Sequence, residues 1–202
     1  MTRTLVVFAK APQLGRVKSR LARGIGPAAA LAFYRRTLAA LLRRVGRDPR
    51  WQTVLAVTPD RAMRWARLWP PRVARFPQGA GDLGTRMART LRSFPAGPVC
   101  IVGADIPDVT AARVWRAFRA LGTADMVFGP AEDGGYWLAG ARRCRDLKLF
   151  ANVRWSTRHA LADTRANLEQ RRVALVDRLQ DIDDLVAYRR WRQRTKRRAI
   201  GP

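Results

Sequence analysis

The chain has 202 residues and carries 40 Lys and Arg against 15 Asp and Glu, which gives a formal net charge of +25 at pH 7. Hydrophobic residues make up 48% of the chain, enough for a sizeable core, so the composition excludes a disordered protein. It also excludes a multi-histidine metal site and a disulfide framework, because the one histidine is His159 and the two cysteines are Cys100 and Cys144.

The N-terminal residues MTRTLVVFAKAP contain a short apolar run that is followed by a lysine, and they lack the pattern of a secretory signal. No apolar run in the chain reaches the roughly 20 residues that a membrane-spanning helix needs. We therefore expect a cytoplasmic protein with no transmembrane segment. Its positive field would attract phosphates and acidic ligands.

Strand and helix patterns alternate along the chain. In the first half they predict a strand at 4–9, a helix at 26–45, a strand at 51–59, a helix at 60–69, a strand at 72–76 and a glycine-rich loop that opens a helix within 78–94. In the second half they predict a strand at 97–105, a helix at 111–121 capped by Thr110, strands at 124–130 and 135–140, a helix at 156–171, a strand at 173–177 and a helix at 181–194. This alternation predicts an α/β fold with a mostly parallel sheet and helices on both faces. We expect a single domain over 1–202, with an arginine-rich C-terminal helix at about 181–198.

The loop after the first predicted strand, KAPQLGRVKSRL at 10–21, is rich in cations. In folds of this kind ligands bind at the carboxyl ends of the strands. Lysine supplies point charges and arginine supplies forked donors, which together suit a di- or triphosphate. The spacing G-x-x-x-x-G-K-S/T of the Walker loop is absent, and a solvated basic loop is the alternative. The residues that we predict to bind phosphate are Ala9, Lys10, Pro12, Arg16 and Lys18.

Acidic residues are scarce, yet seven of the 15 fall within three short segments: Asp105, Asp108, Glu132, Asp133, Asp181, Asp183 and Asp184. Mg²⁺ and Mn²⁺ prefer carboxylate oxygens. We predict that Asp105 is the first metal ligand and Asp133 the second, and that both are catalytic. Asp108 is also typical of a turn, and the acids at 181–184 would offset a helix dipole, although Asp181 could reach the site.

Two further segments are candidates for ligand contact. The loop GAGDLGTRM at 79–87 opens a predicted helix whose N-terminal N–H groups could hold an anion or a base edge. Its candidate nucleotide-binding residues are Gly81, Asp82, Leu83 and Gly84. On the acceptor side the candidates are Gly134, Gly135, Tyr136 and Trp155, while Ser156 is interpreted as a helix N-cap.

Six segments then match a known family in order and spacing: FAKAPQLGRVKSRL, GDLGTRM, IVGADIPDVT, GPAEDGGYWLAG, VRWST and LQDIDDL. The sequence resembles the bacterial glycosyltransferases associated with arsenosugar biosynthesis, in the nucleotide-diphospho-sugar transferase superfamily. Phospholactate guanylyltransferase and molybdenum cofactor guanylyltransferase are relatives of that family. The resemblance runs from the first strand to Asp184. One departure is Ala104-Asp105-Ile106-Pro107, where the family more often has Thr-Asp-Cys-Pro.

The resemblance implies a GT-A-like (Rossmann-like) three-layer α/β/α sandwich. It implies that Lys10, Arg16 and Lys18 embrace the nucleotide phosphates and that the loop at 81–84 contacts base or ribose. It also implies that Asp105 binds Mg²⁺ or Mn²⁺ and that Asp133 completes the metal or acceptor site.

The function expected from these features is transfer from a nucleotide-activated donor to a small-molecule acceptor, with a nucleotide sugar as the first choice. Nucleotidyl transfer from a nucleoside triphosphate is the alternative, because both reactions need the same metal and cations. A second alternative is nucleic-acid binding through the basic tail YRRWRQRTKRR at 188–198. No motif for specific nucleic-acid recognition accompanies that tail.

Overall fold

A seven-stranded sheet forms the centre of the computed structural model, which describes residues 2–71, 73–143 and 148–200. The strand order is β3-β2-β1-β4-β6-β5-β7. The strands are β1 (Thr4–Lys10), β2 (Gln52–Thr58), β3 (Ala74–Pro77), β4 (Val99–Gly103), β5 (Met126–Pro130), β6 (Tyr136–Ala141) and β7 (Val173–Leu175). Two residues used in the sequence analysis lie outside the described residues: Cys144, and Arg72, the first residue of the strand predicted at 72–76.

The sheet is mostly parallel, as the sequence predicts, but β6 runs antiparallel to both β4 and β5. The reason is the length of the connection: only residues 131–135 separate β5 from β6. A parallel connection needs a crossover of a dozen or more residues, whereas a short loop joins antiparallel neighbours. The antiparallel strand was not foreseen from the sequence.

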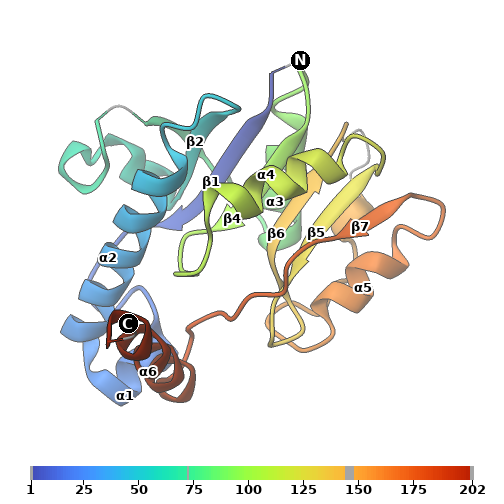
Figure 1. Ribbon diagram of the computed structural model, residues 1–202. Helices are drawn as coiled ribbons and strands as arrows, with labels where there is room; N and C mark the ends of the chain where they lie inside the picture. The colour runs from blue at the N-terminus through green and yellow to red at the C-terminus, as the bar shows by residue number, and fades with distance from the viewer. Residues whose placement is uncertain (1, 72, 144–147, 201–202) are drawn as a thin grey trace.

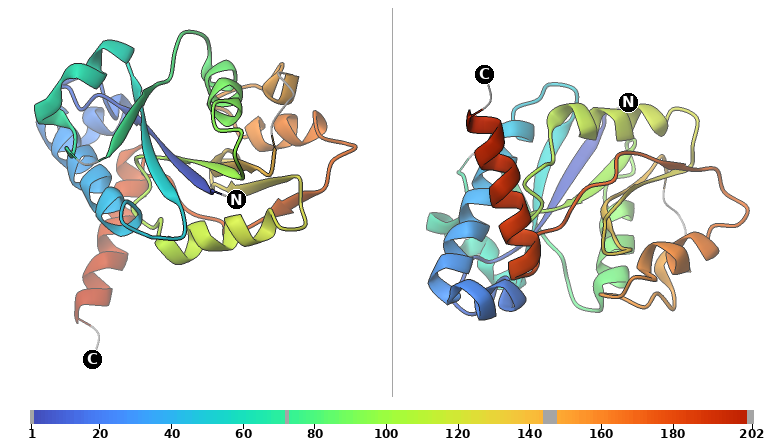
Figure 2. Two further views of the ribbon diagram at one scale, coloured as in Figure 1. Left: turned by 90° about the horizontal axis from the view of Figure 1, so that it is seen from above. Right: turned by 60° about the horizontal axis from the view of Figure 1, so that its bottom comes forward.

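Helices cover both faces of the sheet, which confirms the expected three-layer α/β/α arrangement. The helices are α1 (Ser19–Ile25), α2 (Pro27–Val45), α3 (Leu83–Arg92), α4 (Ala111–Ala120), α5 (Ala160–Ala166) and α6 (Leu185–Ile200), with short 3₁₀ segments η1 (Asp60–Arg64), η2 (Ala66–Leu68) and η3 (Lys148–Phe150). Figure 2 shows α3 and α5 on one side of the sheet and α4 on the other. No helix among the described residues is long and apolar enough to cross a membrane.

The alternation of side chains along β1 explains how one strand serves both layers. Leu5 and Val7 belong to the core beneath α2 and α4, whereas Val6 belongs to the core beneath α3 and α5. Successive side chains of a strand point to opposite faces, so a strand covered on both sides reads as a continuous apolar run. β1 thus holds the loop that follows it against a rigid sheet.

The structure shortens or divides three of the predicted helices. Residues 60–69 form η1 and η2 instead of one α-helix: the backbone breaks at Trp65, and Pro70 and Pro71 prevent a helix from continuing beyond η2. The helix predicted at 156–171 is reduced to α5, and Ser156 is not its N-cap, since its φ of 61° lies in the left-handed region. The helix predicted from 181 begins at Leu185, where the Asp184 carboxylate accepts a hydrogen bond from the Ala187 N–H at 2.8 Å.

Helix α6 packs beside α1 and α2 at one edge of the molecule (Figure 1). Tyr188 and Trp191 turn inward and each meets Phe33 of α2 edge-on, with ring centroids 5.3 Å apart. Gly24 of α1 leaves room for Leu185, since a Cβ at Gly24 would lie 2.8 Å from the Cβ of Leu185. This packing fixes the segment before α6, which carries three of the clustered acids.

Candidate functional site

A cleft of about 560 Å³ opens at the edge of the sheet where the parallel strands end. Segments that are far apart in the sequence contribute to it, as expected for a fold whose ligands bind at the carboxyl ends of strands. Its charged lining residues are Lys10 at the end of β1, Arg16 and Lys18 in the loop that follows, Arg20 in α1, Asp105 after β4, Asp133 between β5 and β6, and Asp181 and Asp183 before α6.

Lys18 lies at the centre of the charged part of the cleft. Its Nζ is 2.8 Å from an oxygen of Asp105, 3.1 Å from one of Asp181 and 2.6 Å from one of Asp183, and its side chain is only 3% exposed. The Lys18 backbone has φ 48° and ψ 46°, a left-handed conformation that non-glycine residues adopt mainly where the surrounding structure imposes it. Burial alone would lower the pKa of Lys18, but the three carboxylates outweigh burial and raise it.

The three carboxylates around Lys18 lie close together: one oxygen from each of Asp105, Asp181 and Asp183 falls within 4.8 Å of the others. Burial, and next the charge of Asp105, raise the pKa of Asp181 to about 7. Three carboxylates against one ammonium leave two negative charges in excess when all are ionised. We call Asp105, Asp181 and Asp183 the carboxylate trio.

The carboxylate trio fits a divalent cation. Hard cations such as Mg²⁺ and Mn²⁺ prefer oxygen ligands, and a divalent ion would favour the ionised form of Asp181 and match the two excess negative charges of the fully ionised group. The side chains of Asp105, Asp181 and Asp183 are 32%, 21% and 46% exposed, so they remain accessible from the cleft. A bound cation would compete with Lys18 for these oxygens.

The cations Lys10, Arg16 and Arg20 line the same cleft but pair with no acid in the part of the chain that the structure describes. The backbone of Lys10 is fixed, because its N–H donates to the Tyr34 hydroxyl and its carbonyl accepts from that hydroxyl, both at 2.9 Å. Burial first, and then the charge of Asp105, raise the pKa of Tyr34 above its usual range. The cleft therefore presents unpaired cations next to the carboxylate trio.

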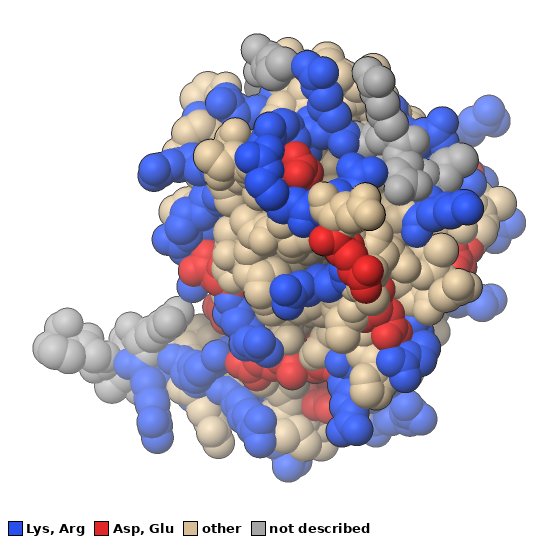
Figure 3. Space-filling view, turned by 90° about the vertical axis from the view of Figure 1, so that its right-hand side faces the viewer, with Lys and Arg blue, Asp and Glu red and all other residues tan. Residues whose placement is uncertain are grey.

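Basic and acidic side chains are distributed differently over the surface of the protein. Figure 3 shows Lys and Arg side chains spread over the face that it presents, whereas Asp and Glu side chains gather in a few groups. In a chain of net charge +25, a local excess of negative charge is unusual. Cations are therefore weak markers of function in this protein, and clustered acids are stronger ones.

The other residues predicted to bind nucleotide divide between the cleft and its surroundings. Leu83 lines the cleft. Ala9 is buried within β1, and the Pro12 carbonyl accepts a hydrogen bond from Arg35 at 3.2 Å. Asp82 is the N-cap of α3, where its carboxylate accepts from the Thr85 N–H at 2.8 Å; hydrogen bonding from the Thr85 side chain, and next from this N–H, lowers the pKa of Asp82.

The two glycines predicted to bind nucleotide, Gly81 and Gly84, have structural reasons to be glycine. Gly81 has φ 106°, in the left-handed region. A Cβ on Gly84 would lie 2.8 Å from the Cβ of Phe150 and 2.9 Å from the ring of Trp155. Contact of either glycine with a nucleotide stays a prediction.

Of the residues predicted on the acceptor side and in the β5–β6 loop, Asp133, Gly135, Tyr136 and Trp155 line the cleft. The Asp133 carboxylate accepts a hydrogen bond from the Gly135 N–H at 2.9 Å, and Asp133 is not a member of the carboxylate trio. Gly134 has φ 87°, and a Cβ there would collide with the Arg158 carbonyl. The catalytic and metal roles of Asp133 stay predictions, as does the acceptor role of Gly134.

Sequence reasoning missed Asp183, which was interpreted as part of a helix N-terminus. The structure shows instead that residues 181–183 precede α6 and cross to the cleft. The available signal was the concentration of acids in LQDIDDL in an otherwise basic chain. Ser156, interpreted as a cap, also lines the cleft.

Solved structures with the same fold include nucleotide-diphospho-sugar and nucleotidyl transferases. A candidate nucleotide-diphospho-sugar transferase from Desulfovibrio desulfuricans G20 is 26% identical, with a TM-score of 0.87 over 98% of this chain and 91% of that one. A nucleotidyl transferase from Methanothermobacter thermautotrophicus is 16% identical, with a TM-score of 0.60 over 97% and 98% of the two chains. Molybdopterin-guanine dinucleotide biosynthesis protein A from Archaeoglobus fulgidus is 14% identical, with a TM-score of 0.56 over 96% and 99%.

The fold is therefore the α/β/α fold of nucleotidyl and nucleotide-sugar transferases. Residues 41–157, more than half of the chain, match the family model described as an uncharacterized protein conserved in bacteria, DUF2064. The chain belongs to this family. The comparison with curated proteins found no match.

Proposed function

We propose that the chain is a metal-dependent transferase that uses a nucleotide-activated donor, with a nucleotide sugar as the first choice. The observation that carries the proposal is the carboxylate trio, with its excess negative charge, beside the unpaired cations Lys10, Arg16 and Arg20 in one cleft. A nucleoside diphosphate group has the complementary composition, because it binds cations through its oxygens and also brings a divalent ion to carboxylates.

In the proposed reaction an acceptor oxygen forms a bond to the anomeric carbon of the sugar, and the bond from that carbon to the phosphate oxygen breaks. The nucleoside diphosphate leaves with the bonding electrons, and the acceptor loses its proton. A divalent ion held by the carboxylate trio would neutralise charge on the leaving group. Lys10 and Arg16 would contact its phosphates, and Asp133, which lines the same cleft, would take the proton.

Nucleotidyl transfer from a nucleoside triphosphate is the second candidate. Its support is the structural likeness to a nucleotidyl transferase and to a molybdopterin-guanine dinucleotide biosynthesis protein. In that reaction pyrophosphate would leave and the nucleotidyl group would move, with the same residues in the same roles. The association with arsenosugar biosynthesis and the cytoplasmic location stay expectations from the sequence.

Nucleic-acid binding through the basic tail has less support than either reaction. Tyr188 and Trp191, the aromatic residues that would stack on bases, are partly buried and each packs edge-on against Phe33. The arginines that remain exposed on α6 offer charge without stacking.

A thermal-shift screen tests the proposal. UDP-, GDP- and dTDP-sugars and the free triphosphates are added to the protein with and without Mn²⁺. A ligand at 100 times its Kd would stabilise the folded state by about 2.7 kcal/mol. We expect stabilisation that requires the divalent ion, is lost in Asp105→Asn, and persists in Asp48→Asn, whose carboxylate pairs with Arg50 on the surface. If no nucleotide raises the melting temperature under any condition, the proposal is wrong.

A further inference from the structure

The wall of the cleft formed by the α3 and α5 side of the sheet is apolar. Phe8 and Ile101 on the strands, Leu83 and Met87 of α3, Tyr136 at the start of β6, and Trp155 before α5 line it. Met87 and Ile101 are buried, whereas Phe8, Leu83, Tyr136 and Trp155 are only partly buried. We call these four partly buried residues the apolar wall.

The apolar wall presents carbon to the cleft, because the polar groups of its aromatic residues are directed elsewhere. The Tyr136 hydroxyl lies 3.4 Å from the buried Thr164 hydroxyl, and burial raises the pKa of Tyr136. The indole nitrogen of Trp155 is shielded from solvent. A ligand that lies against these rings meets apolar surface and finds few hydrogen-bonding partners.

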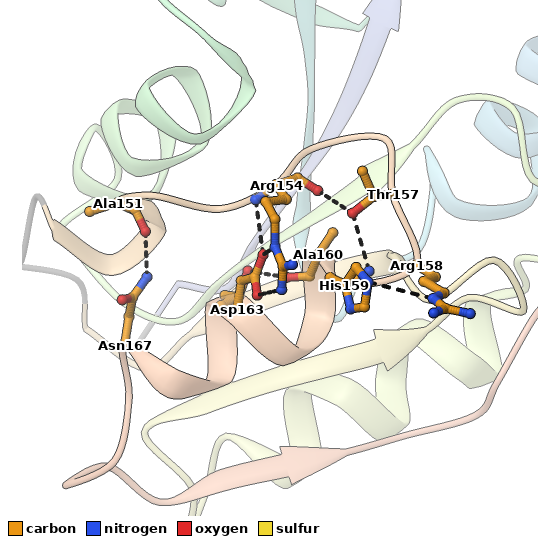
Figure 4. A network of polar contacts seen from close by, with 9 residues as sticks. Ala151, Arg154, Thr157, Arg158, His159, Ala160, Asp163 and Asn167 are labelled. Atoms are coloured by element: carbon orange, nitrogen blue, oxygen red, sulfur yellow. Dashed lines mark hydrogen bonds and ion pairs between the residues drawn. The ribbon is translucent and has the colours of Figure 1, made fainter.

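The apolar wall is also preformed. The Trp155 ring lies 6.1 Å from Phe150 and 6.2 Å from Tyr136, between centroids. Figure 4 shows the contacts that hold the adjoining loop: the Asp163 carboxylate accepts from the Arg154 guanidinium at 2.7 and 2.9 Å and from the Arg154 N–H at 3.0 Å. A binding surface that is already ordered loses little conformational entropy when a ligand binds.

Exposed apolar side chains are few elsewhere in the described part of the chain. The large ones are Leu14, Leu175 and Val186, which lie in three separate segments and do not line the cleft. Partly buried apolar residues such as Trp65 and Trp115 occur elsewhere too, so the apolar wall is distinguished by its place in the lining of the cleft. When a ligand covers apolar side chains at a concave site, each Å² of apolar surface that it buries contributes about 25 cal/mol to the free energy of binding. Such a grouping in a cleft is characteristic of a small-molecule site.

We propose that the acceptor of the transfer reaction is a small alcohol with a flat, aromatic or otherwise apolar body, and that it lies against the apolar wall. This inference rests on the proposed function, which leaves the acceptor undefined. The charged half of the cleft suits the donor phosphates, and Asp133 is the carboxylate that lines the cleft from the β5–β6 loop. The acceptor hydroxyl would point toward Asp133, and the body would cover Tyr136 and Trp155.

Equilibrium binding of neutral probes tests the acceptor class without any turnover. The probes are 2-naphthol and 2-phenylethanol, compared with glucose and glycerol, each with and without a bound nucleotide and Mn²⁺. We expect the aromatic alcohols to bind and the two polyols not to bind. The indole N–H signal of Trp155, identified by its loss in Trp155→Phe, would shift in NMR spectra when 2-naphthol is added.

A matched pair of variants locates the probe. Leu83→Ser replaces an apolar residue of the wall, whereas Leu175→Ser makes the same change on β7, where Leu175 is 48% exposed and outside the cleft. We expect Leu83→Ser to weaken 2-naphthol binding about tenfold, because the probe would no longer bury the apolar surface of the Leu83 side chain. Leu175→Ser should leave the binding unchanged. The indole signal of Trp155 gives the same answer in the unmodified protein if Leu83→Ser does not fold.

Four results would overturn the inference. Binding of glucose without binding of aromatic alcohols would make the wall a sugar site. Competition between 2-naphthol and the nucleotide, with both weakened by Leu83→Ser, would assign the wall to the nucleobase. Binding of 2-naphthol in a protein that binds no nucleotide would refute the proposed function and, with it, the role of the apolar wall as an acceptor site. Nucleotide binding without 2-naphthol binding refutes the inference alone.

Discussion

Two groups of ion pairs have similar distances but differ in their burial and in the balance of their charges. Around Lys18 three carboxylates meet one buried ammonium at 2.6 to 3.1 Å. Near α5 one carboxylate, Asp163, meets one guanidinium, Arg154, at 2.7 Å, and the Arg154 side chain is 60% exposed. The Arg154–Asp163 pair balances its charges and holds a loop. The Lys18 group does not balance its charges, which is what prepares it for a further cation.

In a strongly basic protein, the distance between charged groups does not by itself show which ion pairs belong to a functional site. Unbalanced charge, burial and a left-handed backbone at Lys18 coincide at one place in the cleft. Balanced surface pairs contribute little to stability, commonly below about 1 kcal/mol. Buried groups of unequal charge are costly unless a partner is supplied.

The largest effect is expected from Asp105→Asn. Removal of one charged ligand from the carboxylate trio should lower the transferase rate on the order of 100-fold or more, since the metal could no longer be held against the leaving group. The measurement is the initial rate with saturating Mn²⁺. Asp108→Asn is the matched control, because Asp108 belongs to the same loop but contacts Arg194 on the surface at 3.4 Å. Equal losses in both variants would refute a special role for Asp105.

Lys18→Met should destabilise the metal-free protein by about 2 kcal/mol, because three partly exposed carboxylates that repel one another would lose the ammonium group that pairs with them. Mn²⁺ should restore much of this loss by taking the place of the ammonium group. Urea unfolding with and without Mn²⁺ measures both effects. Arg154→Met provides the comparison, and its stability should not depend on Mn²⁺. A Lys18→Met protein that Mn²⁺ does not stabilise would contradict the assignment.

Phe33→Leu tests whether α6 positions the acids. Phe33 is 1% exposed and contacts Tyr188 and Trp191, so the substitution should cost about 1 kcal/mol of stability. It should also weaken Mn²⁺ binding, because the segment that carries Asp181 and Asp183 depends on α6.

Phe118→Leu is the matched control for Phe33→Leu. Phe118 is 3% exposed and packs on Trp51 away from α6. The control should lose similar stability without losing Mn²⁺ affinity. If both variants bind Mn²⁺ equally well, α6 does not position the carboxylate trio.

The smallest effect concerns the Arg154–Asp163 pair. The hydrogen bonds from Arg154 lower the pKa of Asp163 to about 2, below the ordinary value of about 3.9. A carboxylate with a depressed pKa in the folded state contributes stability above pH 4, and this contribution is lost as the pH falls toward 2. The acid-unfolding curve of Asp163→Asn should therefore be slightly less steep between pH 4 and 2, and Mn²⁺ should not affect the difference. A strong Mn²⁺ effect would remove the contrast between the two groups.

The sequence predicts those parts of this structure that depend on local patterns. The apolar run of β1, the Thr110 cap of α4, which accepts from the Arg113 N–H at 3.3 Å, and the placement of Lys18 and Asp105 in the loops that follow β1 and β4 are of this kind. The antiparallel direction of β6 could also have been predicted from the sequence, because the loop of residues 131–135 is too short for a parallel crossover.

The sequence does not predict the partners that the carboxyl end of β4 acquires from the far end of the chain. Asp181 and Asp183 reach Asp105 because the segment after β7 crosses to α6 and α6 docks on Phe33 (Figure 1). The contact between α6 and Phe33 joins residues that are far apart in the sequence. It depends on packing between helices, which no short sequence pattern encodes. The apolar wall is equally non-local, since its residues come from β1, α3, β6 and the loop before α5.

The central claim is that the carboxylate trio binds one divalent ion. Electron paramagnetic resonance titration with Mn²⁺ measures this directly, through the loss of the signal of free aqueous Mn²⁺. We predict one bound ion per chain in the wild type, none at that affinity in Asp105→Asn, and one in Asp163→Asn. Mn²⁺ binding that is absent from the wild type, or that is unchanged by Asp105→Asn, would contradict the account.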